Sequence, residues 1–389
     1  MTADHRHEFA DFEGVTYLNA ALQGPMPLAA ARAAEAALEW KKRPYQLPDA
    51  LYFDLPDRIR DKTAALIGAR ADEIAVTTGA SAGLASVAAG IDWKPGDEVL
   101  VGRGEFPAHF STWLSYQKVG KLRVRIITPK GRFITADDYI EQIGPRTRVV
   151  SASLVRFDNG VRLDAARVAE SCEKQGTALL LDLSQCAGAM KLDIRELGAA
   201  MAVCSGYKWL LGPYGTGFFW VANEWVERLT LGSVYFMALE GARNFHALPI
   251  ENQQAAPGAR RWDSAETANF TNLAAFESSL DLLLRIGTNA IATHIRLLVD
   301  ELIKRLPVTR CRLASPEECD RRGPYVCISA PNPDDTPALY EKLRSAQVDV
   351  SLRENALRIA PHIYNTREHI SRLVEILSEQ AADAGYREP

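Results

Sequence analysis

The chain has 389 residues, of which 47% are hydrophobic and 24% are charged, and its formal net charge is −4. This length is enough for two domains, and the composition is typical of a soluble globular protein. The slightly acidic balance does not support a nucleic-acid partner, because that requires basic residues gathered on one face.

The N-terminal residues 1–13 are polar and lack the apolar run of a signal peptide. No window of the sequence reaches the roughly 18 consecutive apolar residues of a membrane span. The six cysteines form no Cys-x-x-Cys pair and have no histidine at zinc-ligand spacing, which predicts reduced, mostly buried thiols and no metal site. We therefore expect a cytoplasmic protein without a membrane partner.

Apolar runs alternate with helical patterns over the first half of the chain. Gly68 is a C-terminal stop for an amphipathic helix that ends over Arg60–Gly68. Strands are expected at Glu73–Thr78, Glu98–Gly102, Leu122–Thr128, Arg148–Ser153, Ala178–Asp182, Met201–Ser205 and Gly217–Val221. Helices are expected from the turn after Glu73–Thr78 to Gly90 and at Ala108–Val119, Ala136–Ile143 and Leu163–Gln175. This alternation predicts an α/β fold with a mainly parallel sheet between helices.

The second half of the chain has a different pattern. Met237–Asn269 is rich in Gly, Pro, Asn, Gln and Arg without periodicity, so we expect a long functional loop. After it, helices are expected at Leu273–Ile286, Asn289–Leu306 and Thr336–Ala346, and strands at Tyr325–Ser329 and Ala356–Ile359. This tail has the composition of a compact α+β domain.

The stretch from Ala178 to Lys208 carries the most informative chemistry. Asp182 ends one apolar run, and Lys208 follows shortly after the next. In a pyridoxal phosphate site, a lysine forms a Schiff base with the cofactor aldehyde and a carboxylate keeps the pyridine nitrogen protonated. For these two residues alone, the simpler interpretation is a strand end and a solvated surface lysine.

The neighbouring residues favour the cofactor site. Gly79–Gly83 lies between an expected strand and a helix, where backbone N–H groups bind phosphate, and Ser81 adds a hydroxyl donor. Ser205 and Tyr207 are further candidate phosphate donors, and Gln185 could reach the phenolic oxygen of the cofactor. The Gly79–Gly83 turn lacks the lysine of a nucleotide P-loop, so the alternative of a nucleotide-binding α/β protein has little support.

Three motifs together resemble one family. They are Asp182-x-x-Gln185, Ser205-Gly-Tyr-Lys208 and the ending from Arg358 to Thr366. The chain resembles the class V aminotransferase family of fold-type I pyridoxal phosphate enzymes, which contains cysteine desulfurases, isopenicillin N epimerase-like proteins and kynureninase. The resemblance extends over nearly the whole chain, beginning at Tyr17–Ala21.

The resemblance implies roles for the cofactor-binding residues. The backbone of Ala80 and the side chains of Ser81, Ser205 and Tyr207 would bind the phosphate, with Tyr207 standing where the family often has histidine. Phe106, within Glu-Phe-Pro-Ala, would stack on the cofactor ring.

Other roles implied by the resemblance concern the substrate and a second subunit. Arg358 would bind the substrate α-carboxylate, since a guanidinium suits that bidentate contact. Asn19 would line the substrate pocket. Thr267 would reach the phosphate of a neighbouring subunit, although Ala268 replaces the proline of that family segment.

Two segments depart from the family pattern. Val348–Leu357, which corresponds to the cysteine-bearing loop of cysteine desulfurases, contains no cysteine, and Cys327 lies within an expected strand. Arg156 and Phe157 stand where the family often has an asparagine or glutamine that contacts the cofactor ring. Arg156 could instead meet a second acidic group on the substrate.

The resemblance implies a pyridoxal-phosphate-dependent enzyme that acts on the amino group or Cα of a small amino acid. It would be aminotransferase-like, working through an external aldimine and a quinonoid with Lys208 as general base. A lyase that performs β-elimination, as cysteine or selenocysteine lyases do, an epimerase and a catalytically silent cofactor-binding protein are open alternatives. The sequence leaves the substrate undetermined.

The resemblance also implies the organisation of the molecule. It predicts a large domain over residues 15–267 and a small α+β domain over residues 268–389, which the N-terminal segment 1–14 joins. The protein would be a homodimer with its sites at the subunit interface, and this would explain the long irregular stretch before Asn269.

Overall fold

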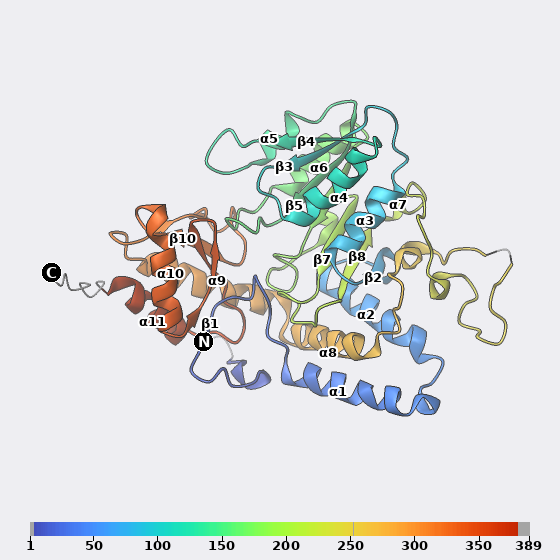
Figure 1. The fold of residues 1–389 in the computed structure, drawn as a ribbon, viewed down its shortest axis with the longest axis horizontal. Helices are drawn as coiled ribbons and strands as arrows, with labels where there is room; N and C mark the ends of the chain where they lie inside the picture. The colour runs from blue at the N-terminus through green and yellow to red at the C-terminus, as the bar shows by residue number, and fades with distance from the viewer. Residues whose placement is uncertain (1–3, 252, 380–389) are drawn as a thin grey trace, which may run out of the picture.

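The computed structural model describes residues 4–251 and 253–379. Figure 1 shows a larger body that contains most of the blue-to-yellow segments and a smaller part, in orange and red, beside it. The larger body is built around one sheet, and the smaller part around another.

The central sheet has seven strands in the order β2-β8-β7-β6-β5-β3-β4. Every neighbouring pair is parallel except those that involve β8, which is antiparallel to β2 and β7. The strands are β2 (Ile74–Thr77), β3 (Glu98–Gly102), β4 (Arg123–Ile127), β5 (Thr147–Ser153), β6 (Ala178–Asp182), β7 (Met201–Ser205) and β8 (Gly217–Val221). All seven agree with the expected strands to within one residue at each end, and the mainly parallel sheet is confirmed.

Helices cover both faces of this sheet, so its central strands are apolar throughout. Within β6, Leu179 and Leu181 face one core and Ala178 and Leu180 face the other. On the second face lie α3 (Ala80–Gly90) and α4 (Pro107–Lys118); α2 (Leu51–Ile67) and α6 (Ala165–Lys174) contribute to the first. The short helices α5 (Ala136–Ile140) and α7 (Asn223–Val226) complete the connections.

The long helix α8 (Phe270–Ile286) packs against α1 (Leu28–Lys42) and α2, and Figure 1 shows the three together. The expected domain boundary after residue 267 stays a prediction, although α8, which it places in the small domain, contacts helices of the larger body.

Helix α9 (Thr288–Arg305) follows after a 79° bend at Gly287. Among the described helices, none alone is long and apolar enough to cross a membrane, and the pair α8 and α9 meets that test of length and composition only together.

The smaller part contains an antiparallel sheet in the order β12-β13-β10-β9. Its strands are β9 (Arg312–Leu313), β10 (Val326–Ser329), β12 (Ser351–Arg353) and β13 (Ala356–Ile359), and its helices are α10 (Thr336–Ser345) and α11 (Arg367–Ser378). The N-terminal strand β1 (Thr16–Tyr17) pairs in parallel with β11 (Val348–Asp349). The start of the chain is thereby attached to the C-terminal part.

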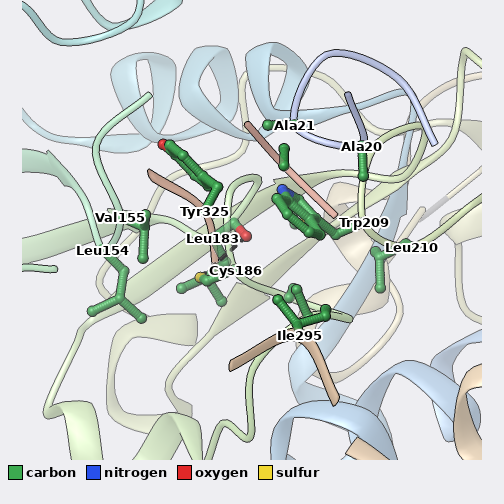
Figure 2. Close-up of a cluster of buried hydrophobic side chains, with 14 of the residues drawn as sticks. Ala20, Ala21, Leu154, Val155, Leu183, Cys186, Trp209, Leu210, Ile295 and Tyr325 are labelled. Carbon is green, nitrogen blue, oxygen red and sulfur yellow. Dashed lines mark hydrogen bonds between the residues drawn. The ribbon is translucent and has the colours of Figure 1, made fainter. Parts of the chain in front are cut away.

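A buried cluster around Trp209 connects these parts just after Lys208. Figure 2 shows the Trp209 indole among Ala20 and Ala21 of the N-terminal segment, with Tyr325 close by. The Trp209 ring stacks on Tyr325 with the centroids 6.1 Å apart. The lysine loop is therefore supported by residues from distant parts of the sequence.

The described part of Met237–Asn269, which leaves out residue 252, is irregular, as expected, apart from short 3-10 turns. Figure 1 shows part of it projecting from the larger body. It returns to the sheet where Asp263 accepts a hydrogen bond from Val76 N at 2.9 Å and Ser264 accepts one from Thr78 N at 3.3 Å. This return lies beside the turn that leads to α3.

Candidate active site

Of the predicted site residues, Asp182 and Ser205 lie at the carboxyl edge of the central sheet, whereas Arg358 belongs to β13 of the smaller sheet. Asp182 ends β6 and is in register with Ser153 at the end of β5, and Ser205 ends β7 opposite Gly217. Ligands bind at this edge of open α/β sheets. The parallel strands therefore bring Asp182 and the loop that carries Lys208 to one side of the molecule.

Lys208 is 7% exposed, and its side chain lies against aromatic rings. Its Nζ is 5.1 Å from the centroid of Phe106 and 5.6 Å from that of Tyr207. Burial lowers the pKa of Lys208; the Arg358 guanidinium adds to this shift, and the Asp182 carboxylate opposes it. A larger fraction of this side chain is consequently neutral amine than in an exposed lysine.

Asp182 is buried at 6% exposure and is contacted from two sides. Its Oδ1 accepts a hydrogen bond from Ser184 N at 2.7 Å, and its Oδ2 lies 3.5 Å from His109 Nε2. Burial by itself would raise the pKa of Asp182, but His109, Lys208 and Ser184 together lower it. The group is held as a carboxylate, as required opposite a protonated pyridine nitrogen.

The turn before α3 forms a cradle for an anion. Gly79 has a φ of +141°, a conformation that favours glycine. A Cβ at Gly217 would lie only 2.8 Å from Gly79 Cα, so the close approach of this turn to β8 also requires glycine at position 217. Ala80 N donates to Ser205 Oγ at 3.2 Å, and Ser81 is exposed in the first turn of the helix. This arrangement suits a phosphate group.

Phe106 and Tyr207 lie against Lys208, and Gln185 contacts the adjacent Trp209. The Gln185 amide donates to Ala21 O at 3.1 Å and accepts from Trp209 Nε1 at 2.9 Å. The Tyr207 ring stacks on Tyr214 at 4.0 Å. Phe106 is 38% exposed at the N-cap of α4, where it is free to contact a ligand. Their roles toward the cofactor stay predictions.

Arg358 and Asn19 meet through Ser351. Arg358 is 1% exposed; its Nη1 donates to Phe157 O at 3.1 Å, its Nη2 donates to Ser351 Oγ at 3.4 Å, and its buried Nε has no partner. Ser351 Oγ donates to Asn19 Oδ1 at 2.6 Å. Asn19 thus positions Ser351 beside Arg358, which retains donor capacity for a carboxylate.

Arg156 is engaged within the protein. Its guanidinium contacts Asp158 at 3.0 Å and Glu105 at 3.5 Å and donates to Arg103 O at 2.8 Å. Glu105 in turn accepts hydrogen bonds from Ser153. This buried network occupies the guanidinium, so a contact between Arg156 and a second acidic group of the substrate is not supported.

Thr267 is buried three residues after Ser264, in the segment that returns beside β2. A role of Thr267 toward a neighbouring subunit stays a prediction.

The cysteines occupy packed positions. Cys327 is fully buried, donates to Asp158 O at 3.3 Å, and has a pKa that burial raises to about 12. The described segment Val348–Leu357 holds no cysteine, and Cys319 is the exposed thiol. Among residues 4–251 and 253–379, no group of three or more potential metal ligands occurs. Cys204, whose charge would act on Lys208, is fully buried, and burial raises the pKa of its thiol well above the usual value. Among the described residues, no thiolate nucleophile therefore stands beside Lys208.

Sequence analysis missed His109 and Gly24. His109 lies one turn after Phe106 in α4 and contacts Asp182, a pairing across distant segments that no local motif reveals. Gly24 N donates to Tyr207 O at 2.9 Å, and a Cβ on Gly24 would lie 2.0 Å from Lys208 O. Gly24-Pro25 marks a turn in the sequence, but its contact with the lysine loop requires the fold.

Comparisons with known proteins identify relatives of the whole chain. The chain is 27% identical over 317 residues to the uncharacterized aminotransferase YcbU of Bacillus subtilis, and the alignment covers 81% of each chain. It is 26% identical over 403 residues to isopenicillin N epimerase of Amycolatopsis lactamdurans, and the alignment covers 97% of this chain and 98% of the relative.

A solved complex between the cystine C-S lyase C-DES and its reaction product cysteine persulfide has the same fold. It superposes with a TM-score of 0.84 at 22% identity, covering 94% of this chain and 99% of that one. Residues 52–373 match the family model described as Aminotransferase class-V. The chain therefore belongs to the class V aminotransferase family of fold-type I proteins and is a pyridoxal-phosphate-dependent enzyme that acts on amino acids.

Proposed function

We propose that this enzyme removes the Cα proton of a small amino acid with Lys208 as base and transfers the amino group as an aminotransferase. The observation that carries the proposal is the position of Lys208. It is buried between aromatic rings at the sheet edge where Asp182 is held as a carboxylate. Perturbed titratable groups with a specific partner are typical of functional sites.

The chain's own residues fit pyridoxal phosphate. When bound, the cofactor supplies an aldehyde that condenses with amines and a protonated ring that withdraws electrons from Cα. The N-terminus of α3 at Ala80, with Ser81 and Ser205, would hold the phosphate. Asp182 would pair with the pyridine nitrogen, and Phe106 would cover the ring.

Lys208 and Arg358 have different roles toward the substrate: Lys208 accepts the proton and Arg358 binds the carboxylate. Burial lowers the pKa of Lys208, which favours the neutral amine that accepts a proton. The unpartnered Nε of Arg358 and its two other nitrogens offer donors to a carboxylate. A substrate anchored on Arg358 would present its Cα to Lys208 in a fixed orientation, which lowers the entropic part of the barrier.

Transamination is the first branch of this proposal, supported by the family and by the name of the Bacillus subtilis relative. Epimerisation is the second candidate, supported by the relative named isopenicillin N epimerase. A persulfide route like that of cysteine desulfurases is not supported, because Val348–Leu357 holds no cysteine and Cys327 is packed with a raised pKa. β-Elimination, which needs no such thiol, is the remaining outcome of the assay.

The test combines absorption spectra with product analysis. Pyridoxal phosphate added to the purified protein should produce a visible absorption band that Lys208→Ala abolishes. Keto acid formed with stoichiometric amino transfer identifies transamination, inversion at Cα identifies epimerisation, and ammonia with a keto acid identifies elimination. No band, or a band unchanged by Lys208→Ala, overturns the proposal; Lys304→Ala, on α9, serves as the matched control.

We also propose a homodimer with a cytoplasmic location. Part of the irregular segment Met237–Asn269 projects from the larger body, and Ile250 within the segment is an apolar side chain at 82% exposure. Such a segment is suited to contact a second copy of the chain. Sedimentation of the purified protein tests the dimer, and cell fractionation tests the location.

A further inference from the structure

His109 is a fully buried imidazole that the proposed chemistry does not use directly. It lies in the first turn of α4, between Ser151 of β5 and Asp182 of β6. Its Nδ1 is 2.7 Å from Ser151 Oγ, and its Nε2 is 3.5 Å from Asp182 Oδ2. No hydrogen bond is made by the buried Nε2, so this nitrogen faces the carboxylate without another partner.

The groups behind the ring are compatible with a hydrogen on Nε2. Trp113 Nε1 donates to Ser151 Oγ at 2.9 Å, and an indole nitrogen can only donate. The Ser151 hydroxyl can then give its own hydrogen to His109 Nδ1, which leaves the ring hydrogen on Nε2. A protonated imidazolium would carry a hydrogen on Nε2 as well. In both states the nitrogen that faces Asp182 is a donor.

The remaining form of the ring is unfavourable. A neutral ring with its hydrogen on Nδ1 would place the Nε2 lone pair against the Asp182 carboxylate, so that two acceptors face each other without a hydrogen. Burial and the neighbouring charges also act on the ring. Burial and Arg156 lower the pKa of His109, but Asp182 and Glu105 raise it, and the net shift is upward. This balance also favours a hydrogen on Nε2.

We propose that His109 is a positioning residue that donates its Nε2 hydrogen to Asp182 Oδ2, while Ser151 and Trp113 fix the ring from behind. This inference rests on the proposed function, in which Asp182 pairs with the pyridine nitrogen. Ser184 N holds the other oxygen, so the carboxylate is oriented from both sides. The 3.5 Å separation suits a bond that tightens when a ligand binds, as active-site hydrogen bonds often do.

The first test is nitrogen NMR on protein labelled with ¹⁵N in histidine, as apoprotein and with pyridoxal phosphate bound. His109→Phe identifies the His109 signals. We expect a hydrogen-bearing Nε2 whose signal moves in Asp182→Asn. A bare Nε2, or a signal that Asp182→Asn leaves in place, overturns the proposal.

The second test compares His109→Phe with His109→Gln, because the glutamine amide can place a donor near the position of Nε2. In the loaded enzyme, His109→Phe should move the pH midpoint of the visible band. It should also lower kcat roughly 10- to 100-fold with little change in KM, by analogy with the range seen when an outer residue that orients a metal ligand is removed. His109→Gln should restore most of both properties. The exposed His7→Phe is the control and should change neither.

The outcomes separate this role from a structural one. If both variants lose kcat in step with their thermal unfolding temperature, or if His109→Phe behaves like the parent, the inference is wrong. Failure of the proposed function appears elsewhere, as a visible band that is absent or that survives Lys208→Ala. The NMR measurement on the apoprotein reports the contact between His109 and Asp182 in either case.

Discussion

Burial and the charges of Asp182 and Arg358 act together on the pKa of Lys208. Asp182 favours its ammonium form, whereas burial and the Arg358 guanidinium favour the neutral amine. The cofactor ring would engage Asp182 and the substrate carboxylate would engage Arg358, so each ligand neutralises one of these influences. The side chain that acts as base is therefore sensitive to whether both ligands are in place.

Arg358 provides a prediction at this scale. Arg358→Lys keeps the positive charge but removes the planar fork, which is not a conservative change at a bidentate site. We expect KM for the amino acid to rise roughly 10- to 100-fold, equivalent to the loss of about 1.5–3 kcal/mol for a charged hydrogen bond. Steady-state kinetics with the amino acid and with the amine that lacks its carboxylate measure the effect.

The amine comparison identifies the cause. If Arg358 binds the carboxylate, the parent should discriminate strongly against the amine and the variant should discriminate much less. Arg344→Lys, at an exposed position of α10, is the control and should leave both KM values unchanged. Equal discrimination by parent and variant would contradict the assignment.

The N-terminal segment around Gly24 packs tightly on the lysine loop. Gly24 packs on Lys208 O so tightly that a Cβ would lie 2.0 Å away. We expect Gly24→Ala to reduce the free energy of unfolding by about 1–3 kcal/mol, as overpacking does, and to weaken cofactor binding. Urea unfolding and titration with pyridoxal phosphate measure these two effects.

Gly131→Ala is the matched control for that substitution. A Cβ at Gly131 meets nothing within 4 Å, so the change in unfolding free energy should stay within about 0.5 kcal/mol. If the two alanine variants bind cofactor and unfold alike, the close approach of Gly24 is not important for the site.

The elements also show how far the sequence is informative. Asp182 and Lys208 were predictable because each follows an apolar strand, and parallel strands place such ends on one edge. The pairings of His109 with Asp182 and of Arg156 with Glu105 were not, because the partners are 73 and 51 positions apart and no local pattern joins them. The elements β1, β11, α1 and α11 were likewise not predicted from the sequence. The two short strands depend on each other for pairing, since neither has a hydrophobic period of its own.

For the whole molecule, the proposed dimer leads to a complementation experiment. If Thr267 serves the site of the other subunit, Lys208→Ala and Thr267→Arg proteins should each be inactive. In a mixed dimer, the site with an intact Lys208 would face an intact Thr267. Dissociating and reassociating an equal mixture should then restore roughly a quarter of the parent activity, because half of the dimers would each have one complete site.

The alternative gives a different result. If Thr267 acts within its own chain, the mixed dimer holds one defect in each site, and the mixture should stay inactive. Sedimentation after reassociation verifies that dimers have formed. An inactive mixture of verified dimers would contradict the shared site.

The attachment of residues 16–24 at both ends has a mechanical consequence. At one end, Thr16 and Tyr17 pair with β11, the strand next to the sheet that carries Arg358. At the other end, Gly24 N donates a hydrogen bond to Tyr207 O. Because residues 16–24 are a short segment held at both ends, a displacement of one end is passed on to the other. Any motion of the C-terminal sheet that accompanies capture of an amino acid would pull directly on the peptide that carries the reactive amine, so recognition and chemistry would be coupled through the backbone itself.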